Sequence, residues 1–134
     1  MSIRFDIPTL DAADSRALAA FWAELLGLVV REEEEDGRWV LLGTPEGQRV
    51  LGIQRTAETV LRSGSLVPLT GPDKPRLHLD LCCDLSEFEE KVTWLTSIGA
   101  VLRRRIRTES YGRVANFADP EGHLFDLCAY IRAD

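Results

Sequence analysis

The segment YGRVANFADPEG, residues 111–122, recurs without gaps 75 positions earlier as DGRWVLLGTPEG, residues 36–47. Both copies carry Gly-Arg near the start and Pro-Glu-Gly at the end, and strand-like residues flank both. A proline followed two positions later by glycine favours a turn, because proline presets φ and glycine accepts a positive φ. Each copy therefore predicts a β-hairpin, and the repeat predicts a chain of two similar modules.

One helix is predicted in each half of the chain. Asp14 precedes the first helical pattern as an N-cap residue, and Gly27 ends it. In the second half, Ser86 and Glu89 match the S-x-x-E pattern of a capping box, and Gly99 ends the helix. Each helix has one apolar stripe, as expected for a helix that lies on a sheet. The stripes are Leu18, Phe21, Trp22, Leu25 and Leu26 in the first helix and Phe88, Val92, Leu95 and Ile98 in the second.

Strand-like segments surround both helices, so each half has the order β-α-β-β-β. We therefore predict an α+β fold of one domain over residues 1–134, made of two tandem βαβββ modules. A helix on one face of a sheet leaves the other face uncovered. We expect two curved mixed sheets to pair around a cleft, with the helices on the outer faces. The modules are 1–56 and 76–134 with a linker over 57–75, and the predicted strands are 3–11, 28–34, 38–43, 49–55, 76–83, 100–107, 112–118 and 123–131.

The charge balance narrows the classes of partner. A formal net charge of −6 argues against a nucleic-acid binder, which must neutralise phosphates. An acidic surface favours a cationic small ligand over an anionic one. Four arginines within residues 103–107 are a local exception. They indicate either a solvated strand or a nucleic-acid patch, and no interleaved aromatic residues support stacking on bases.

Composition also bears on location. No apolar run approaches the roughly 20 residues of a membrane span, and the first residues do not match a signal peptide. The three cysteines do not form the pattern of a disulfide framework. We expect a cytoplasmic protein with no membrane partner, because free cysteines suit a reducing compartment.

The chain resembles the vicinal oxygen chelate superfamily, and within it the glyoxalase-like and bleomycin-resistance proteins. This resemblance implies the paired-module fold, a small-molecule ligand in the cleft and a homodimer. In metal-dependent members, each module supplies one ligand from its first strand and one carboxylate from its last strand. Such an ion acts as a Lewis acid on vicinal oxygens. The resemblance is carried by LDAAD at 10–14, LAAFW at 18–22, LLG at 25–27, RLHLDL at 76–81 and ADPEGHLF at 118–125.

The second module retains the family's ligand positions. His78 matches the first-strand ligand, and Asp126 stands where the family pattern carries Glu. Side chains alternate along a strand, so Asp80 and Cys82 share the face of His78, while Leu77, Leu79 and Leu81 are expected under the helix. These assignments make His78 and Asp126 candidate catalytic or metal-binding residues.

The first module lacks equivalent ligands. The family's spacing falls on Ile7, which cannot bind metal, and the ungapped repeat places Leu51 opposite Asp126. Gln54 is nearby and could offer an amide oxygen to a hard ion. The candidate metal ligands are therefore His78, Asp126 and Gln54. A divalent ion stays an open alternative, and no cofactor is certain.

Each candidate residue also has a structural interpretation. His78 is either a hydrogen-bonded structural imidazole or a general base or ligand. A buried Asp126 requires a partner, whereas an edge position would leave it exposed. Cys82 and Cys128 fit small core residues better than nucleophiles, and His123 is expected to be exposed. The candidate substrate-binding residues are Asp80, Asp11 (or a capping or turn residue), Trp39 (or a core residue), Asn116, Gln54 and Tyr111.

Two functions follow from this pattern. The first is a glyoxalase-like lyase or isomerase that acts on a small oxygenated substrate. In such an enzyme, His78 would move a proton and Asp126 would orient the His78 imidazole, or both residues would hold an ion. The second is a non-catalytic drug-binding protein of the bleomycin-resistance kind. An extradiol dioxygenase is disfavoured, since it needs two histidines and one carboxylate, and His123 has the wrong strand phase beside Asp126.

Overall fold

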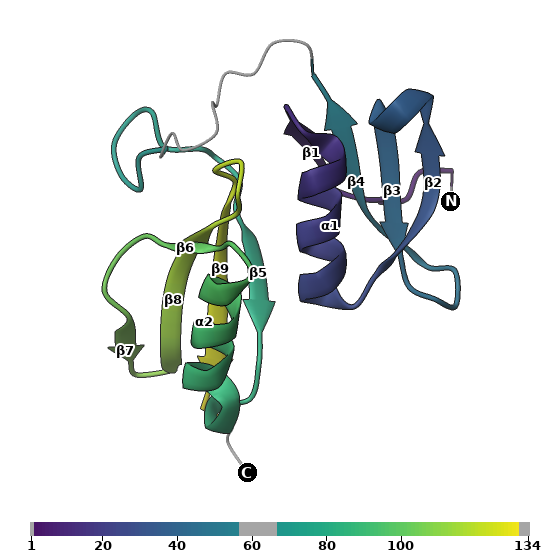
Figure 1. Ribbon diagram of the computed structural model, residues 1–134. Coiled ribbons are helices and arrows are strands. Elements are labelled where there is room, and N and C mark those ends of the chain that lie inside the picture. Colours follow the sequence, from purple (N-terminus) through teal and green to yellow (C-terminus); the bar gives the residue numbers. More distant parts are fainter. Residues whose placement is uncertain (1, 57–66, 132–134) are drawn as a thin grey trace. The chain divides into compact units, whose positions relative to one another are not determined.

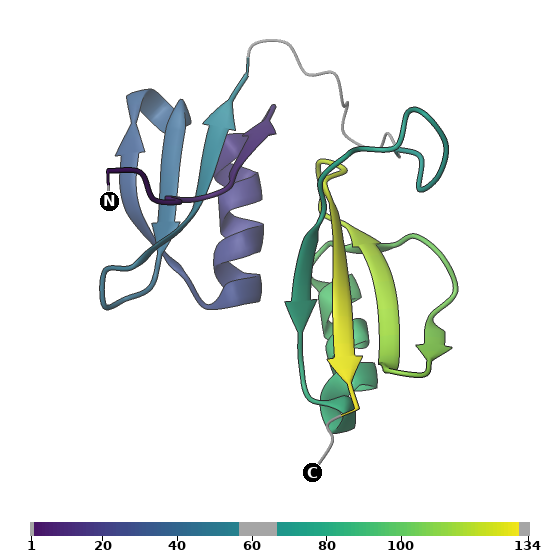
Figure 2. The same ribbon diagram turned by 180° about the vertical axis from the view of Figure 1, so that it is seen from behind.

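The computed structural model describes residues 2–56 and 67–131. The chain divides into two compact units, one on each side of the 57–66 segment, and part of the predicted linker lies outside the described residues. In each unit a helix covers one face of a mixed sheet (Figures 1 and 2). The α+β class and the two βαβββ modules are therefore confirmed. The cleft between paired sheets stays a prediction.

The first unit is a four-stranded sheet with one long helix. Its strand order is β1-β4-β3-β2, with β1 parallel to β4 and the remaining pairs antiparallel. The elements are β1 (Thr9–Ala12), α1 (Ser15–Leu26), β2 (Val29–Glu34), the short 3-10 helix η1 (Glu35–Gly37), β3 (Trp39–Gly43) and β4 (Arg49–Arg55).

The second unit repeats this topology, with its last edge strand in two pieces. The order is β5-β9-β8-β6, and β7 also pairs with β8. The strand predicted over 100–107 is therefore wrong in its extent, because residues 103–106 separate two short strands. The elements are β5 (Leu79–Cys82), the 3-10 helix η2 (Leu85–Glu87), α2 (Phe88–Ser97), β6 (Val101–Leu102), β7 (Arg107–Glu109), β8 (Gly112–Ala118) and β9 (Leu124–Tyr130).

The two helices begin differently. The Asp14 carboxylate accepts a hydrogen bond from the Ala17 amide at 3.1 Å, and Gly27 ends α1 with a φ of 68°. These predictions are confirmed. The capping box predicted at Ser86 is wrong. Ser86 lies inside η2, whereas an N-cap residue needs a non-helical backbone, and α2 starts at Phe88 without a side-chain cap.

Alternation along β9 decides which side chains stay out of the core. Phe125 and Leu127 are buried, as are Phe88 and Leu95 of α2, and each large apolar side chain buried contributes about 1.5–3 kcal/mol. Asp126 lies between the two buried residues and therefore on the opposite face. The leucines predicted under the helix pack less well: Leu77 precedes β5 and is 67% exposed.

One register difference separates the two sheets. Leu42 pairs with Leu51 but Gly43 pairs with Arg49, so β4 carries one extra residue at a β-bulge. The β8–β9 ladder runs without a shift from Ala118–Leu124 to Gly112–Tyr130. An extra residue changes which side chain occupies a given place on the sheet face.

This bulge changes the counterpart of Asp126. Asp126 pairs with Asn116, whose repeat counterpart is Leu41, and Leu41 pairs with Gly52. The structural counterpart of Asp126 is therefore Gly52. The predicted counterpart, Leu51, is wrong, because Leu51 is only 2% exposed and belongs to the core.

Candidate metal and ligand site

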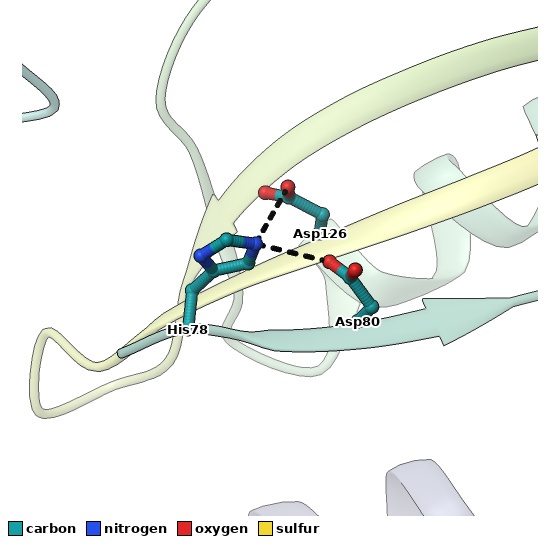
Figure 3. A group of neighbouring side chains, drawn as sticks. All are labelled: His78, Asp80 and Asp126. Carbon is teal, nitrogen blue, oxygen red and sulfur yellow. Dashed lines mark ion pairs between the residues drawn. The ribbon is translucent and has the colours of Figure 1, made fainter. Parts of the chain in front are cut away.

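Three polar side chains gather on the face of the second sheet that α2 does not cover. The His78 Nε2 atom lies 3.2 Å from Asp80 Oδ1 and 3.6 Å from Asp126 Oδ2. Figure 3 shows the imidazole nitrogen facing both carboxylates. One ligand atom from each residue can be chosen so that all lie within 4.8 Å of one another. The structure thus brings together the two residues predicted from the second module and adds Asp80 to them.

Strand pairing explains this cluster. His78 and Asp80 are two residues apart and so share one face of the chain entering β5. The parallel β5–β9 ladder pairs Asp80 directly with Asp126. The side chains are 42% exposed for His78, 59% for Asp80 and 21% for Asp126. Two adjacent carboxylates repel each other, and a cation between them removes that repulsion.

Asn116 holds Asp126 in place from the neighbouring strand β8. Its Nδ2 atom donates to Asp126 Oδ1 at 2.7 Å. This bond occupies one carboxylate oxygen and leaves Oδ2, the oxygen that faces His78, for another partner. The Asn116 Oδ1 atom is buried and accepts no hydrogen bond from the described residues. Asn116 therefore orients Asp126 and has an acceptor to spare.

Arg103 extends this row to the sheet edge and was not predicted as a site residue. Its backbone amide donates to the Asn116 carbonyl at 2.8 Å, which places Arg103 opposite Asn116 in continuation of β6. Its Nη2 atom donates to the Val67 carbonyl at 2.6 Å, and Nη1 is buried without a partner among the described residues. The sequence showed only an arginine-rich segment, and no local signal identifies which arginine pairs with Asn116.

The candidates of the first module form a row of their own. Gln54 pairs with Asp11 on β1 and with Trp39 on β3. Its Nε2 atom donates to the Arg38 carbonyl at 3.4 Å. Asp14, rather than Asp11, caps α1. Gln54 as a metal ligand stays a prediction.

Trp39 occupies the place where the second module has its carboxylate. A Cβ atom built on Gly52 would lie 2.3 Å from Trp39 Cη2 and 2.9 Å from Thr9 Oγ1. The indole therefore lies directly over the glycine. At this place the first module presents an aromatic surface where the second presents Asp126.

Tyr111 and His123 lie outside the cluster. Tyr111 precedes β8, is half exposed, and its ring centre lies 6.3 Å from that of Tyr130. His123 was expected to be exposed, which is wrong: its Nδ1 lies 2.9 Å from Oδ2 of the buried Asp119. Asp119 Oδ1 also accepts from the amides of Glu121 and His123, so these residues fix the turn.

The three cysteines differ in environment. Cys128 is buried, Cys83 is intermediate and Cys82 is exposed, so the core prediction holds for Cys128 and fails for Cys82. Burial raises the pKa of the Cys128 and Cys83 thiols. A hydrogen bond with Cys128 raises the pKa of Tyr130 to about 12.

Comparison with known proteins gives consistent results. The sequence pattern of the glyoxalase-like domain matches residues 8–128. The chain is 27% identical over 124 residues to glyoxalase domain-containing protein 4 of Rattus norvegicus. The aligned region covers 90% of this chain and 38% of that protein. The chain therefore spans less than half of that relative's length.

Solved structures share the fold at low identity. A glyoxalase/bleomycin resistance protein/dioxygenase family enzyme from Burkholderia phytofirmans superposes with a TM-score of 0.69 at 17% identity, over 94% of this chain and 98% of that one. A mutant of the fosfomycin resistance protein FosX from Listeria monocytogenes was solved in complex with Mn(II) and dihydroxypropylphosphonic acid. It superposes with a TM-score of 0.68 at 17% identity, over 98% of this chain and 93% of that one.

In the part of the chain that the structure describes, no helix is both long and apolar enough to span a membrane.

Proposed function

We propose, because the chain belongs to the glyoxalase-like domain family, that it is a metal-dependent lyase or isomerase acting on a small oxygenated substrate. The observation that carries the proposal is the cluster of His78, Asp80 and Asp126, whose ligand atoms lie within 4.8 Å of one another. FosX, which shares the fold, has been solved with Mn(II) and a small oxygenated ligand.

The three side chains fit a divalent cation. Ligand atoms bound about 2.1 Å from one ion lie about 3 Å apart at neighbouring positions. The distances of 3.2 and 3.6 Å from the imidazole to the carboxylates are close to this spacing. One nitrogen and two carboxylate oxygens suit Mn²⁺, and iron and zinc accept the same mixture. Ligands from a single sheet face leave further positions for substrate oxygens.

Each residue then has a defined task. When bound, the ion supplies Lewis-acid polarisation of a substrate oxygen. His78, Asp80 and Asp126 would hold it, and Asn116 fixes the Asp126 carboxylate through a hydrogen bond. Asp80 contacts His78 through Oδ1 and is the most exposed of the three. Its Oδ2 atom can accept a hydrogen bond or a proton from the substrate.

A second candidate function is ligand binding without catalysis. Trp39 over Gly52 favours it, because an indole surface stacks on planar ligands and supplies no metal ligand. In this alternative the protein sequesters a small molecule, as bleomycin-binding proteins do, and needs no ion.

Metal analysis of the purified protein tests the proposal. After chelator treatment and addition of Mn²⁺, we expect one ion per chain by elemental analysis and a bound-ion signal by electron paramagnetic resonance. His78→Ala and Asp126→Asn should each weaken Mn²⁺ binding by at least about 100-fold. Loss of a residue that only orients a ligand typically weakens metal binding by about 10–100-fold, and loss of a ligand should cost at least the upper end of that range. Asp36→Asn, a change at an exposed carboxylate in the first unit, is the matched control and should bind normally. A folded protein that binds no Mn²⁺, iron or zinc would contradict the metal-dependent mechanism and favour ligand binding without catalysis.

A further inference from the structure

Two free cysteines lie side by side next to the candidate metal site. The β5–β9 ladder pairs Cys82 with Cys128, two residues beyond the pair Asp80 and Asp126. Both thiols therefore share the sheet face of these carboxylates. Neighbouring strands are about 4.7–4.9 Å apart, which is within the Cα separation of about 4.4–6.8 Å found in disulfides. The strand pairing thus places the two backbones within the range of Cα separations that a disulfide can bridge.

The two thiols differ in solvent access, and this difference decides which of them meets an oxidant first. Cys82 is exposed and lines a pocket of about 550 Å³ together with Tyr130 and Ile131. Cys128 is 6% exposed, and Tyr130, two residues further along β9, shares its sheet face. A small oxidant therefore reaches Cys82 first, and Cys128 is the neighbouring thiol that can react with the product.

Cys83 provides an internal comparison. It follows the end of β5, where alternation turns its side chain to the other face, and its backbone amide continues the ladder to the Cys128 carbonyl at 3.0 Å. It adjoins Cys82 in sequence and lines the same pocket. Proximity alone therefore does not distinguish Cys83 from Cys128, whereas the direction of the side chain does.

We propose that Cys82 and Cys128 form a reversible redox site that a hydroperoxide oxidises to a disulfide. The Cys82 sulfur attacks the peroxide, the O–O bond breaks, and an alcohol or water leaves, so that Cys82 becomes a sulfenic acid. The Cys128 sulfur then attacks the Cys82 sulfur, the S–O bond breaks, and water leaves. Two thiols lose two electrons and two protons, and the peroxide is reduced. A dithiol reductant reverses the step by exchange. This site does not depend on the proposed metal chemistry.

Oxidation of the purified full chain with hydrogen peroxide tests the proposal. Of the three free thiols, two should be lost in an Ellman assay and recovered with dithiothreitol. Non-reducing peptide mapping should find Cys82 joined to Cys128 within one chain. Cys83→Ser should behave like the wild type. Cys82→Ser should form no disulfide, and Cys128→Ala should leave a sulfenic acid on Cys82 that dimedone traps.

Other products would overturn the inference. These are a disulfide that includes Cys83, a bond between two chains, or sulfinic and sulfonic acids that dithiothreitol does not reduce. Circular dichroism checks the fold of each variant. If Cys128→Ala does not fold, the peptide map of the wild-type protein decides the question alone.

Discussion

The two modules have the same topology but carry opposite chemistry at the same place. In the second, Asp126 lies between Asp80 and Asn116 and accepts a hydrogen bond from the latter. In the first, that place belongs to Gly52, covered by the indole of Trp39. The repeat thus specifies a scaffold twice and a polar site once. The fold and the candidate site therefore depend on different residues of the same segment.

The polar rows are also displaced along the strands. In the first sheet Asp11 pairs with Gln54, and the corresponding pair in the second sheet is Cys82 with Cys128. The first module is therefore polar where the second carries thiols. The polar residues of one module therefore cannot be located in the other by applying the fixed offset of the sequence repeat.

The largest effect is expected where a side chain is added beneath the indole. Gly52→Ala should destabilise the protein by about 1–3 kcal/mol, the usual cost of overpacking, because the new Cβ would lie 2.3 Å from Trp39 Cη2. Urea unfolding followed by circular dichroism measures this. In a Trp39→Ala background the same change should cost less, since only the contact at 2.9 Å with Thr9 Oγ1 remains. Equal costs in both backgrounds would refute the claim that the indole fills this place.

A smaller effect is expected from the residue that orients the carboxylate. Asn116→Ala should weaken Mn²⁺ binding by about 10–100-fold, since it removes the hydrogen bond to Asp126. Titration calorimetry measures the affinity. Gln54→Ala is the matched change in the first module and should leave the affinity within about twofold if the site lies in the second module alone. A comparable loss from Gln54→Ala would instead identify Gln54 as a ligand.

The smallest effects are expected at the N-termini of the two helices. Asp14→Ala should cost about 1 kcal/mol, because the Ala17 amide loses its acceptor. Ser86→Ala should cost under about 0.5 kcal/mol, since Ser86 caps nothing. Thermal unfolding compares both variants with the wild type. A larger loss for Ser86→Ala would mean that the capping box forms after all.

Much of the fold follows from local sequence patterns. The hairpins, the apolar stripes and the Asp14 cap each depend on residues a few positions apart, so they can be predicted without tertiary information. The capping box failed because Ser86 joined a short 3-10 turn, which competes with an N-cap conformation. His123 was misjudged because its partner, Asp119, is buried by the turn that both residues form.

The site was predictable only in part. His78 and Asp126 could be placed together because alternation and a parallel pairing of the first and last strands fix their face. Leu51 was wrongly matched to Asp126, because a bulge shifts β4 by one residue and leaves no mark in the sequence. Arg103 was missed for a similar reason: its position beside Asn116 depends on the register of β6 with β8.

The contact between Trp39 and Gly52 also restricts how this protein can evolve. A mutation at Gly52 alone forces a new side chain into the indole, and loss of Trp39 alone leaves bare backbone with no compensating group. A lineage that gained a carboxylate in the first module would have to pass through one of these weaker intermediates. The benefit of each mutation therefore depends on the other. Such epistasis would preserve the difference between the two halves even without selection for it.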